Sequence, residues 1–564
     1  MISVSGRKWQ EKKVNSKLVE KIQQDTNFSR ILSKLIVSRN FDETEIYLIE
    51  NNLNLSNVFQ TNKDFIESVK LLESSIKNNE NIGIIGDYDV DGSAATALWI
   101  RFLESINHKH FHYIPDREKD GYGASKKLLE KLIKKKPNLI VMVDCGSTSY
   151  EAVDYLNKNN IKSLVIDHHE INQPYPKANS IINPKKNNGY AEYDYFCATT
   201  LTYFFLDMLS KKIQCKIDIS KYLIYVLLAT VCDVMPIRGL NRLIAIIVLN
   251  EFNINTNIAF NQLYKLSNKK NKINIDDLAY LIGPILNSGG RLGKSNYATE
   301  LLSSKKKEIV NKKSLDLINL NNKRKEIETA TLESIDFEKI EEEKNDIIFY
   351  YNPNINEGLL GIIAARLKEY FNKPTFVITN SNNLLKSSAR SIYNYNIGKV
   401  IKHSLDHNII LSGGGHSAAA GFTLKKENLP LFKDFVLKDF KKKGCSTNLI
   451  FEYESEISVS AFNINFFNDI NKISPFGEGN ELPIFLIKDL KVIKSSILKK
   501  KHVSCIFKSK NDFSINSICF DATNKRVGDY LLNYKKNINV VGQINENFWN
   551  NKKTLQLIIK DLLI

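Results

Sequence analysis

Between residues 80 and 170, short apolar runs alternate with helical patterns, and this order predicts a parallel β-sheet with helices on both faces. Ligands bind to such sheets beyond the carboxyl ends of the strands. Each apolar run leads directly into a polar motif with acidic residues, so the three motifs are expected at one edge of the sheet. The runs lie at 82–85, 139–143 and 164–166, and the motifs are GDYDVDG, DCGS and DHH.

The rest of the chain changes periodicity several times. Short amphipathic patterns precede residue 80, helices are predicted from 200 to 300, and strands and helices alternate again after 346. The charge-dense run 303–345, with Leu and Ile at helical spacing, is predicted to be a solvated connecting helix. We therefore expect an α/β fold with an N-terminal segment (1–45), a parallel-sheet domain (46–300), a connecting helix (301–345), a second α/β domain (346–445) and a C-terminal all-β module (446–564).

Composition adds a weak indication of a polyanionic partner. The 564 residues exceed what one core accommodates, and 43% hydrophobic residues suffice for several buried cores. Lys and Arg outnumber Asp and Glu by 79 to 62, a net charge of +17, which favours nucleic acid. The heavy use of Asn, Lys and Ile is also what an AT-rich genome produces, and that bias alone raises the net charge.

Cysteine usage and hydropathy indicate a soluble, cytoplasmic protein without a membrane partner. The seven cysteines are scattered and contain no Cys-x-x-Cys, so neither a disulfide framework nor a zinc ribbon is expected. The N-terminus lacks an apolar signal region. The longest apolar run, around 222–231, is shorter than the roughly 20 residues that cross a membrane.

Carboxylates follow the first predicted strand at every second position. If the backbone stays extended, Asp87, Asp89 and Asp91 lie on one side, where they repel one another unless a cation is bound. An ordinary acidic surface turn is the alternative. The position at the end of a strand favours the metal.

The other strand ends repeat the pattern. Asp144 follows the second run, His168 and His169 follow Asp167 after the third, and Asp233 ends an apolar helix. Together these residues predict a divalent metal site, and their oxygen and imidazole ligands suit Mn²⁺ or Mg²⁺. So many anionic ligands are able to hold two ions, which is the arrangement used in phosphoester hydrolysis. There is no P-loop.

A second histidine group is expected to be irrelevant to the metal. His108, His110 and His112 alternate along a predicted edge strand, but no carboxylate lies within the run. We interpret them as solvated strand side chains.

These motifs, in this order, resemble the DHH phosphoesterase superfamily, and within it a family of bacterial single-strand-specific 5′→3′ exonucleases that combine DHH, DHHA1 and OB-fold domains. The resemblance covers about residues 45–564. The matching motifs are GDYDVDG (86–92), IPDREKDGYG (114–123), VDCGS (143–147), DHH (167–169), ATVCDVMP (229–236), GPILNSGGRL (283–292), GLLGIIAARL (358–367), SSARS (387–391), GGGHSAAAGF (413–422) and PFGEGN (475–480).

The resemblance implies roles for individual residues. Asp144 would bridge two ions, Asp87 would be a ligand or an acid beside them, and His169 would orient or protonate the reacting phosphate. The other metal ligands would be Asp89, Asp91, His168 and Asp233, and the substrate phosphate would meet Arg117, Arg291, Ser388, Arg390 and His416. Two departures stand out. Ile85 replaces a histidine that some relatives carry, so the first metal site would have fewer ligands or would depend on Asp87, and Glu481 replaces a common proline after PFGEGN.

The implied function is an exonuclease that releases 5′-mononucleotides from single-stranded DNA in repair and recombination, alongside a single-strand-binding protein and a helicase. Two alternatives remain open: a hydrolase of nanoRNA, cyclic dinucleotides or pyrophosphate, and a non-catalytic DNA-binding scaffold. The length of the chain and its C-terminal module argue against the first, and the intact ligand motifs argue against the second.

Overall fold

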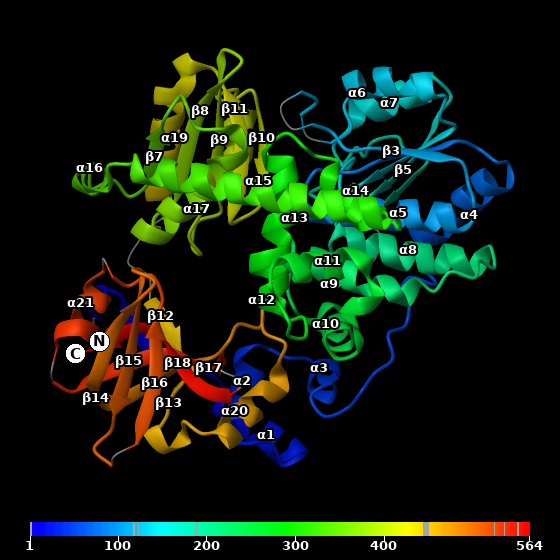
Figure 1. The fold of residues 1–564 in the computed structure, drawn as a ribbon. Coiled ribbons are helices and arrows are strands. Elements are labelled where there is room, and N and C mark those ends of the chain that lie inside the picture. The colour runs from blue at the N-terminus through cyan, green and yellow to red at the C-terminus, as the bar shows by residue number, and fades with distance from the viewer. Residues whose placement is uncertain are drawn as a thin grey trace. The chain divides into compact units, whose positions relative to one another are not determined.

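The structure is a computed structural model that describes residues 3–116, 119–121, 123–186, 190–443, 450–511, 513–523, 525–534, 536–549 and 552–563. The chain folds into two compact units (Figure 1). Unit 1 comprises Met1–Leu55, Pro236–Ala245 and Asn448–Ile564, and unit 2 comprises Ser56–Met235 and Ile246–Thr447. No helix of the described residues is long and apolar enough to cross a membrane.

The first sheet of unit 2 has the predicted parallel arrangement. Its strand order is β3-β2-β4-β5-β6, and every residue of β2 and β4 is buried. The strand order brings the ends of β2, β4 and β5 side by side, because Ile85 pairs with Met142 and Val143 pairs with Ile166. The strands are β2 (Ile82–Ile85), β3 (His110–Tyr113), β4 (Leu139–Val143), β5 (Lys162–Ile166) and β6 (Ser180–Ile182). The predicted fold class is confirmed.

Helices cover both faces of this sheet (Figure 1). On one face, Leu128 and Leu132 of α6 pack with Leu156 of α7 against Ile140 and Met142. α4, α5 and α8 contact the strands from the other face. The helices are α4 (Lys63–Lys77), α5 (Val90–Ser105), α6 (Lys126–Leu132), α7 (Tyr150–Lys158) and α8 (Ala198–Lys212).

The region from 223 to 342 is helical, as predicted, and its long helix is buried along one side. α15 is mainly charged, yet Leu317 is buried, and Arg324 binds Glu328 of the same helix at 2.6 Å. Glu328 also binds Arg366 at 3.0 Å. The prediction of a simple solvated helix was therefore incomplete. The helices are α9 (Leu223–Cys232), α10 (Gly239–Glu251), α11 (Ile258–Leu266), α13 (Gly283–Arg291), α14 (Tyr297–Ser303), α15 (Lys307–Glu333) and α16 (Phe337–Glu342).

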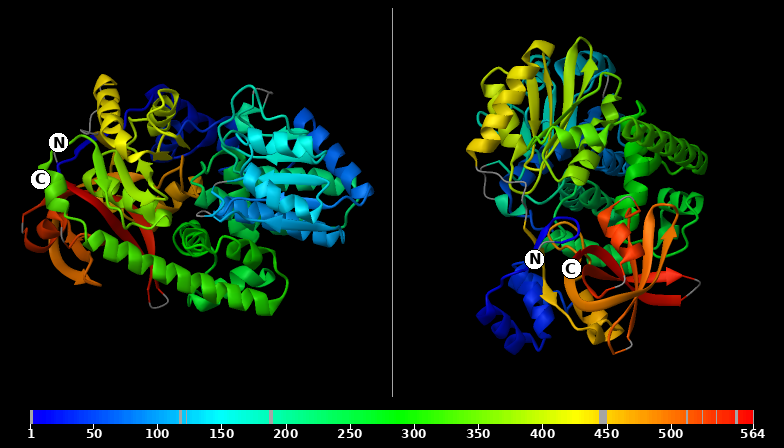
Figure 2. Two further views of the ribbon diagram at one scale, coloured as in Figure 1. Left: turned by 90° about the horizontal axis from the view of Figure 1, so that it is seen from above. Right: turned by 90° about the vertical axis from the view of Figure 1, so that its left-hand side faces the viewer.

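The second sheet of unit 2 has the order β10-β11-β9-β8-β7, with β7 and β8 parallel and the other pairs antiparallel. Phe376, Phe422 and Phe432 pack together beneath it. Figure 2 shows these strands with the helices beside them. The elements are β7 (Ile348–Tyr351), α17 (Leu360–Phe371), β8 (Thr375–Ser381), β9 (Leu384–Arg390), α18 (Ile397–Asp406), β10 (Ser412–Gly415), β11 (Ala419–Leu424) and α19 (Leu429–Lys442).

Unit 1 contains the predicted all-β module. Its sheet, β13-β14-β15-β16-β18-β17, closes on itself because β14 pairs with β17 as well as with β15. The N-terminal helix α2 contributes Leu32, Leu35 and Ile36 to the barrel core. The elements are α1 (Ser16–Thr26), α2 (Arg30–Ser38), α3 (Glu43–Tyr47), β13 (Ser455–Glu456), α20 (Ile464–Ile470), β14 (Ile484–Leu498), β15 (His502–Lys508), β16 (Ser514–Cys519), α21 (Arg526–Asn533), β17 (Ile538–Trp549) and β18 (Lys552–Leu563).

The two ends of the chain meet within unit 1. β1 (Lys8–Glu11) pairs in parallel with β12 (Ile450–Tyr453). The buried carboxylate of Asp561 accepts hydrogen bonds from the hydroxyls of Ser3 and Ser5 and from the indole nitrogen of Trp9. Segment 236–245 joins the same unit, where Arg238 binds Glu45.

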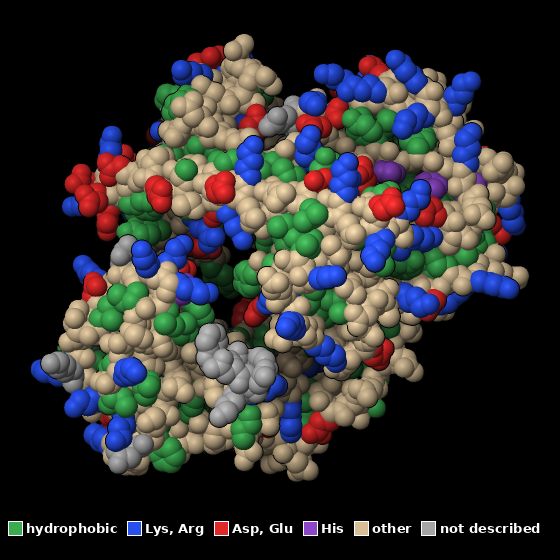
Figure 3. Space-filling view, in the orientation of Figure 1, with side chains coloured by type: hydrophobic (Ala, Val, Ile, Leu, Met, Phe, Trp, Pro, Cys, Tyr) green, Lys and Arg blue, Asp and Glu red, His purple; other side chains and the backbone are tan. Residues whose placement is uncertain are grey.

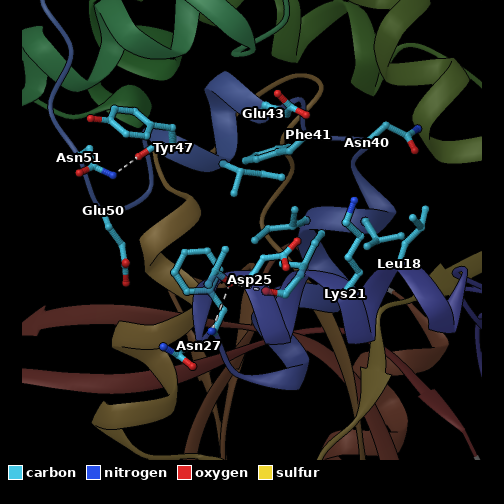
Figure 4. Close-up of a pocket in the computed structure, with 16 residues that line it drawn as sticks. Leu18, Lys21, Asp25, Asn27, Asn40, Phe41, Glu43, Tyr47, Glu50 and Asn51 are labelled. Carbon is cyan, nitrogen blue, oxygen red and sulfur yellow. Dashed lines mark hydrogen bonds between the residues drawn. The ribbon is translucent and has the colours of Figure 1, made fainter.

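A pocket of about 790 Å³ lies among α1, α2 and α3 in unit 1 (Figure 4). Its lining mixes apolar side chains, such as Leu18 and Phe41, with the carboxylates of Asp25 and Glu43. On the face drawn in Figure 3, Lys and Arg side chains are scattered over both units. The positive net charge therefore does not by itself mark a nucleic-acid surface.

Candidate metal centre

The acidic loop after β2 turns sharply into α5. Asp89 is the N-cap of this helix, and its carboxylate accepts a hydrogen bond from the backbone nitrogen of Gly92 at 3.0 Å. A Cβ on Gly92 would lie 2.5 Å from the backbone nitrogen of Asp87, so only glycine permits the turn. The backbone is therefore not extended through Asp91, and the condition for placing all three carboxylates on one side is not met. The helix begins at Val90 and places Asp91 in its first turn.

This turn separates the three carboxylates into two groups. Asp87 and Asp89 have carboxylate oxygens within 4.8 Å of Asp144, whereas Asp91 lies within the same distance of His168 and Asp233. A third group consists of Asp144, His168 and His169, so Asp144 and His168 belong to two groups each. Asp91 also accepts hydrogen bonds from the first backbone nitrogens of α8, those of Ala198 and Thr199, both at 2.7 Å.

Two of the acidic residues lie where the backbone is strained. Asp144, at the end of β4, has φ of 59°, and Val234, directly after Asp233, has φ of 56°. Positive φ is unfavourable for a β-branched side chain and concentrates at functional sites. Burial, followed by the charges of Asp89 and Asp91, raises the pKa of Asp144 well above its usual range. The pKa of Asp233 is raised for the same reasons, burial first.

Asp167 orients the neighbouring histidines. Its carboxylate accepts hydrogen bonds from the backbone nitrogen of His168 at 2.8 Å, from Nδ1 of His169 at 2.8 Å and from the backbone nitrogen of Ser147 at 3.0 Å. Although burial opposes the change, the charge and hydrogen bond of Asp167 raise the pKa of His169 to about 9. Burial and then the charge of His169 lower the pKa of His168 to about 4.

His168 provides the test of whether these residues suit a cation. Its Nε2 lies 3.4 Å from carboxylate oxygens of Asp144 and Asp233 and 3.8 Å from Asp91. The side chain is buried, with 4% of its surface exposed. Even so, neither ring nitrogen has a hydrogen-bond partner among the residues that the structure describes. A buried neutral imidazole that faces three carboxylates without hydrogen bonds is costly unless a metal ion binds between these groups. The donor set therefore fits Mn²⁺ or Mg²⁺.

The second α/β region of unit 2 contributes the other predicted residues. The ring of His416 stacks 5.9 Å from the ring of His169. Ser388 and Arg390 line a pocket of about 500 Å³ together with Tyr88 and the glycines 413–415. Arg291 lies where this region meets α13, because its side chain donates to the carbonyl oxygen of Gly358 at 3.3 Å. Arg117 lies outside the described residues.

Three family models match separate stretches of the chain between residues 81 and 561. The DHH family, N-terminal domain, matches residues 81–230, the DHHA1 domain matches 344–442 and the RecJ OB domain matches 453–561. The chain therefore contains a DHH domain, a DHHA1 domain and a RecJ OB domain. The predicted family and the predicted class of enzyme are thereby confirmed.

Relatives with the RecJ domain set match along most of their length. The single-stranded-DNA-specific exonuclease RecJ of Bacillus subtilis is 24% identical over 99% of this chain and 71% of its own. The RecJ of Haemophilus influenzae is 27% identical over 87% and 89%. Among solved structures, Thermus thermophilus RecJ in complex with Mn²⁺ has a TM-score of 0.81 at 21% identity, covering 99% of this chain and 79% of that one. The Mg²⁺ complex of the same protein has a TM-score of 0.74 at 20% identity, covering 98% and 78%. The ions in these two complexes are the predicted cofactors.

The structure also shows the surroundings of Ile85, of the histidine run 108–112 and of Glu481. Ile85 packs in the apolar core beneath α6 and α7. His108 is buried and His110 and His112 are partly buried, so the prediction of solvated side chains was wrong. Among the described residues, the three histidines are absent from the groups of metal-ligand atoms. Glu481 lies beside PFGEGN, and its carboxylate accepts from the nitrogen of Gly479 at 3.3 Å.

Sequence reasoning did not find Asn183. This buried amide donates to the hydroxyl of Ser147 at 2.7 Å and to the carbonyl of His169 at 2.9 Å, so it ties together the DCGS and DHH loops. The available signal was the Asn-Pro pair at the end of a short apolar run.

Proposed function

We propose that this chain is a metal-dependent exodeoxyribonuclease that hydrolyses single-stranded DNA 5′→3′ to 5′-mononucleotides, with two Mn²⁺ or Mg²⁺ ions per site. The observation that carries the proposal is the placement of Asp144 and His168, each shared between two groups of ligand atoms. Asp144 is grouped with Asp87 and Asp89, His168 is grouped with Asp91 and Asp233, and a third group contains both Asp144 and His168 with His169. The substrate in this proposal comes from the names of the relatives. The 5′→3′ polarity comes from the family resemblance.

In this proposal the ions would supply the charge that activates water and stabilises the reacting phosphate. The protein residues then have separate tasks. Asp144 would bridge the ions, and Asp167 would hold His169 by Nδ1, which leaves Nε2 to hydrogen-bond or protonate a phosphate oxygen. Ser388 and Arg390, in the pocket beside Tyr88, would bind the terminal phosphate, because a guanidinium binds phosphate in a bidentate manner. His416, Arg291 and Arg117 would add phosphate contacts.

The broader setting is also proposed. The division at residues 46, 301, 346 and 446 separates a DHH domain, a connecting helix, a DHHA1 domain and an OB-like domain. The OB-like domain would hold the single strand by stacking and charge. The reaction would serve DNA repair and recombination in the cytoplasm, beside a single-strand-binding protein and a helicase.

The test offers four substrates with Mn²⁺ or Mg²⁺: single-stranded DNA, duplex DNA, dinucleotides and pyrophosphate. We expect a 5′ label on single-stranded DNA to appear at once as mononucleotide, while a 3′ label persists in long fragments. Faster turnover of dinucleotides or pyrophosphate would favour a small-substrate hydrolase, and binding without turnover would favour a scaffold. Asp144→Asn should abolish hydrolysis, whereas Asp154→Asn, an exposed aspartate on α7, should leave it unchanged.

A further inference from the structure

A turn after β6 carries two consecutive lysines close to the DHH loop. Asn183 anchors this turn, since its amide nitrogen donates to the carbonyl of His169 and its amide oxygen accepts from the backbone nitrogen of Lys185 at 2.9 Å. Asn183 is completely buried. The backbone of Lys185 is therefore fixed relative to the backbone of His169.

The two lysines have different partners. Lys186 forms a largely buried ion pair with Asp64 of α4, at 3.0 Å. Lys185 forms an ion pair with Glu170 at 3.2 Å, and the Glu170 side chain is 65% exposed. The Lys185 side chain is 23% exposed, but Glu170 reaches water, and an ion pair with one solvated partner contributes about 1 kcal/mol, so an anion is able to replace Glu170 at small cost. Lys186 stabilises the fold, whereas Lys185 has a partner that is easily exchanged.

The ammonium group of Lys185 lies close to the DHH motif, because its partner Glu170 directly follows His169 in the chain. Burial and then Lys185 lower the pKa of His416, and Lys185 contributes to the lowered pKa of His168 after burial and His169. Lys185 also opposes the rise in the pKa of Asp233, which burial and neighbouring carboxylates cause. These groups belong to the DHH loop, the end of α9 and the glycine-rich loop before β11. The ion pair with Glu170 and the turn anchored by Asn183 therefore place the ammonium group of Lys185 beside the DHH loop.

We propose that Lys185 binds a phosphate group of the DNA strand beside the metal centre and leaves Glu170 when the strand enters. The centre is strongly acidic, so a phosphodiester that approaches it needs a compensating positive charge. A lysine ammonium binds phosphate as a point charge and adapts to successive phosphates, unlike a bidentate guanidinium. This inference rests on the proposed nucleic-acid substrate.

The test measures kcat/KM on 5′-phosphorylated single-stranded DNA against salt concentration. Lys185→Gln should lower kcat/KM by at least about tenfold and reduce the slope of log(kcat/KM) against log[salt] by about 0.7, the value for one phosphate contact on a single strand. Lys185→Arg should keep most of the rate and the slope. Lys177→Gln, which removes an equal charge at an exposed position, should change neither.

Binding measurements separate this inference from the proposed function. Fluorescence anisotropy of a labelled oligothymidylate, with Ca²⁺ in place of Mn²⁺, reports the same salt slope without hydrolysis. If the wild type fails to cut DNA, the proposed function fails, and this slope still decides the role of Lys185. An unchanged slope for Lys185→Gln in both assays would overturn the inference, as would a loss of rate explained entirely by weaker Mn²⁺ binding in calorimetry.

Discussion

The acidic centre destabilises the metal-free protein, and replacement of Asp144 by Asn should relieve this. Asp144 has a carboxylate oxygen within 4.8 Å of Asp87 and Asp89, and at that distance two full charges repel by about 3 kcal/mol at an effective dielectric constant of about 20. Protonation of the Asp144 carboxyl removes this repulsion and so limits the loss of stability. Holding a proton at pH 7 costs at most about 4 kcal/mol, which is 1.36 kcal/mol for each of roughly three pH units. We expect Asp144→Asn to stabilise the metal-free protein by about 1 to 4 kcal/mol at pH 7.

The pH dependence of this stabilisation follows from the direction of the pKa shift of Asp144. Asp144 has a raised pKa in the folded state, so the folded protein binds more protons than the unfolded chain and loses stability as pH rises above the usual carboxyl pKa. The advantage of Asp144→Asn should therefore shrink towards zero near pH 4. Native-state hydrogen exchange of the buried helix α5, in EDTA, measures the opening free energy of unit 2 directly. Asp154→Asn is the matched control.

Saturating Mn²⁺ should reduce the advantage of the variant by up to about 2.7 kcal/mol, since a ligand at about 100 times its Kd adds roughly that much to the wild type and much less to the variant. The reasoning would be refuted if Asp144→Asn lowered the opening free energy in EDTA at pH 7. An advantage of the same size at both pH values would refute it as well.

Three further outcomes are expected. Metal-free protein should lose stability between about pH 6.5 and 9 as His169 loses its proton beside Asp167, and His169→Gln should flatten that part of a thermal-melting profile. Arg390→Ala should mainly reduce the preference for 5′-phosphorylated over 5′-hydroxyl ends in competition assays, and equal discrimination would count against its role. Gly358→Ala should destabilise unit 2 by about 1 to 3 kcal/mol in urea denaturation, because its Cβ would lie 2.2 Å from a carbonyl oxygen, whereas Gly421→Ala, with no atom nearer than 3.6 Å, should be neutral.

Local periodicity predicted the parts of the fold that depend on neighbouring residues. β2 and β4 are fully buried, so unbroken apolar runs gave their bounds correctly, and the strand ends located Asp144 and the DHH motif. The position of Asp91 was harder to predict from the sequence. Asp89 caps α5, so the helix starts where an extended loop was assumed from the alternate spacing of the carboxylates. The periodicity of the sequence also could not predict contacts between residues that are far apart in the chain. Only the family resemblance associated His416 with the site, since no spacing rule joins residues so distant in sequence.

The meeting of the two chain ends in unit 1 has a consequence during translation. Asp561 is synthesised 552 residues after Trp9, and β12 is also synthesised long after β1, so the N-terminal segment lacks these partners during most of the intervening synthesis. Unit 2 is finished earlier and is free to fold first. Until the barrel forms, the apolar side chains of α2 that belong to its core remain exposed to water.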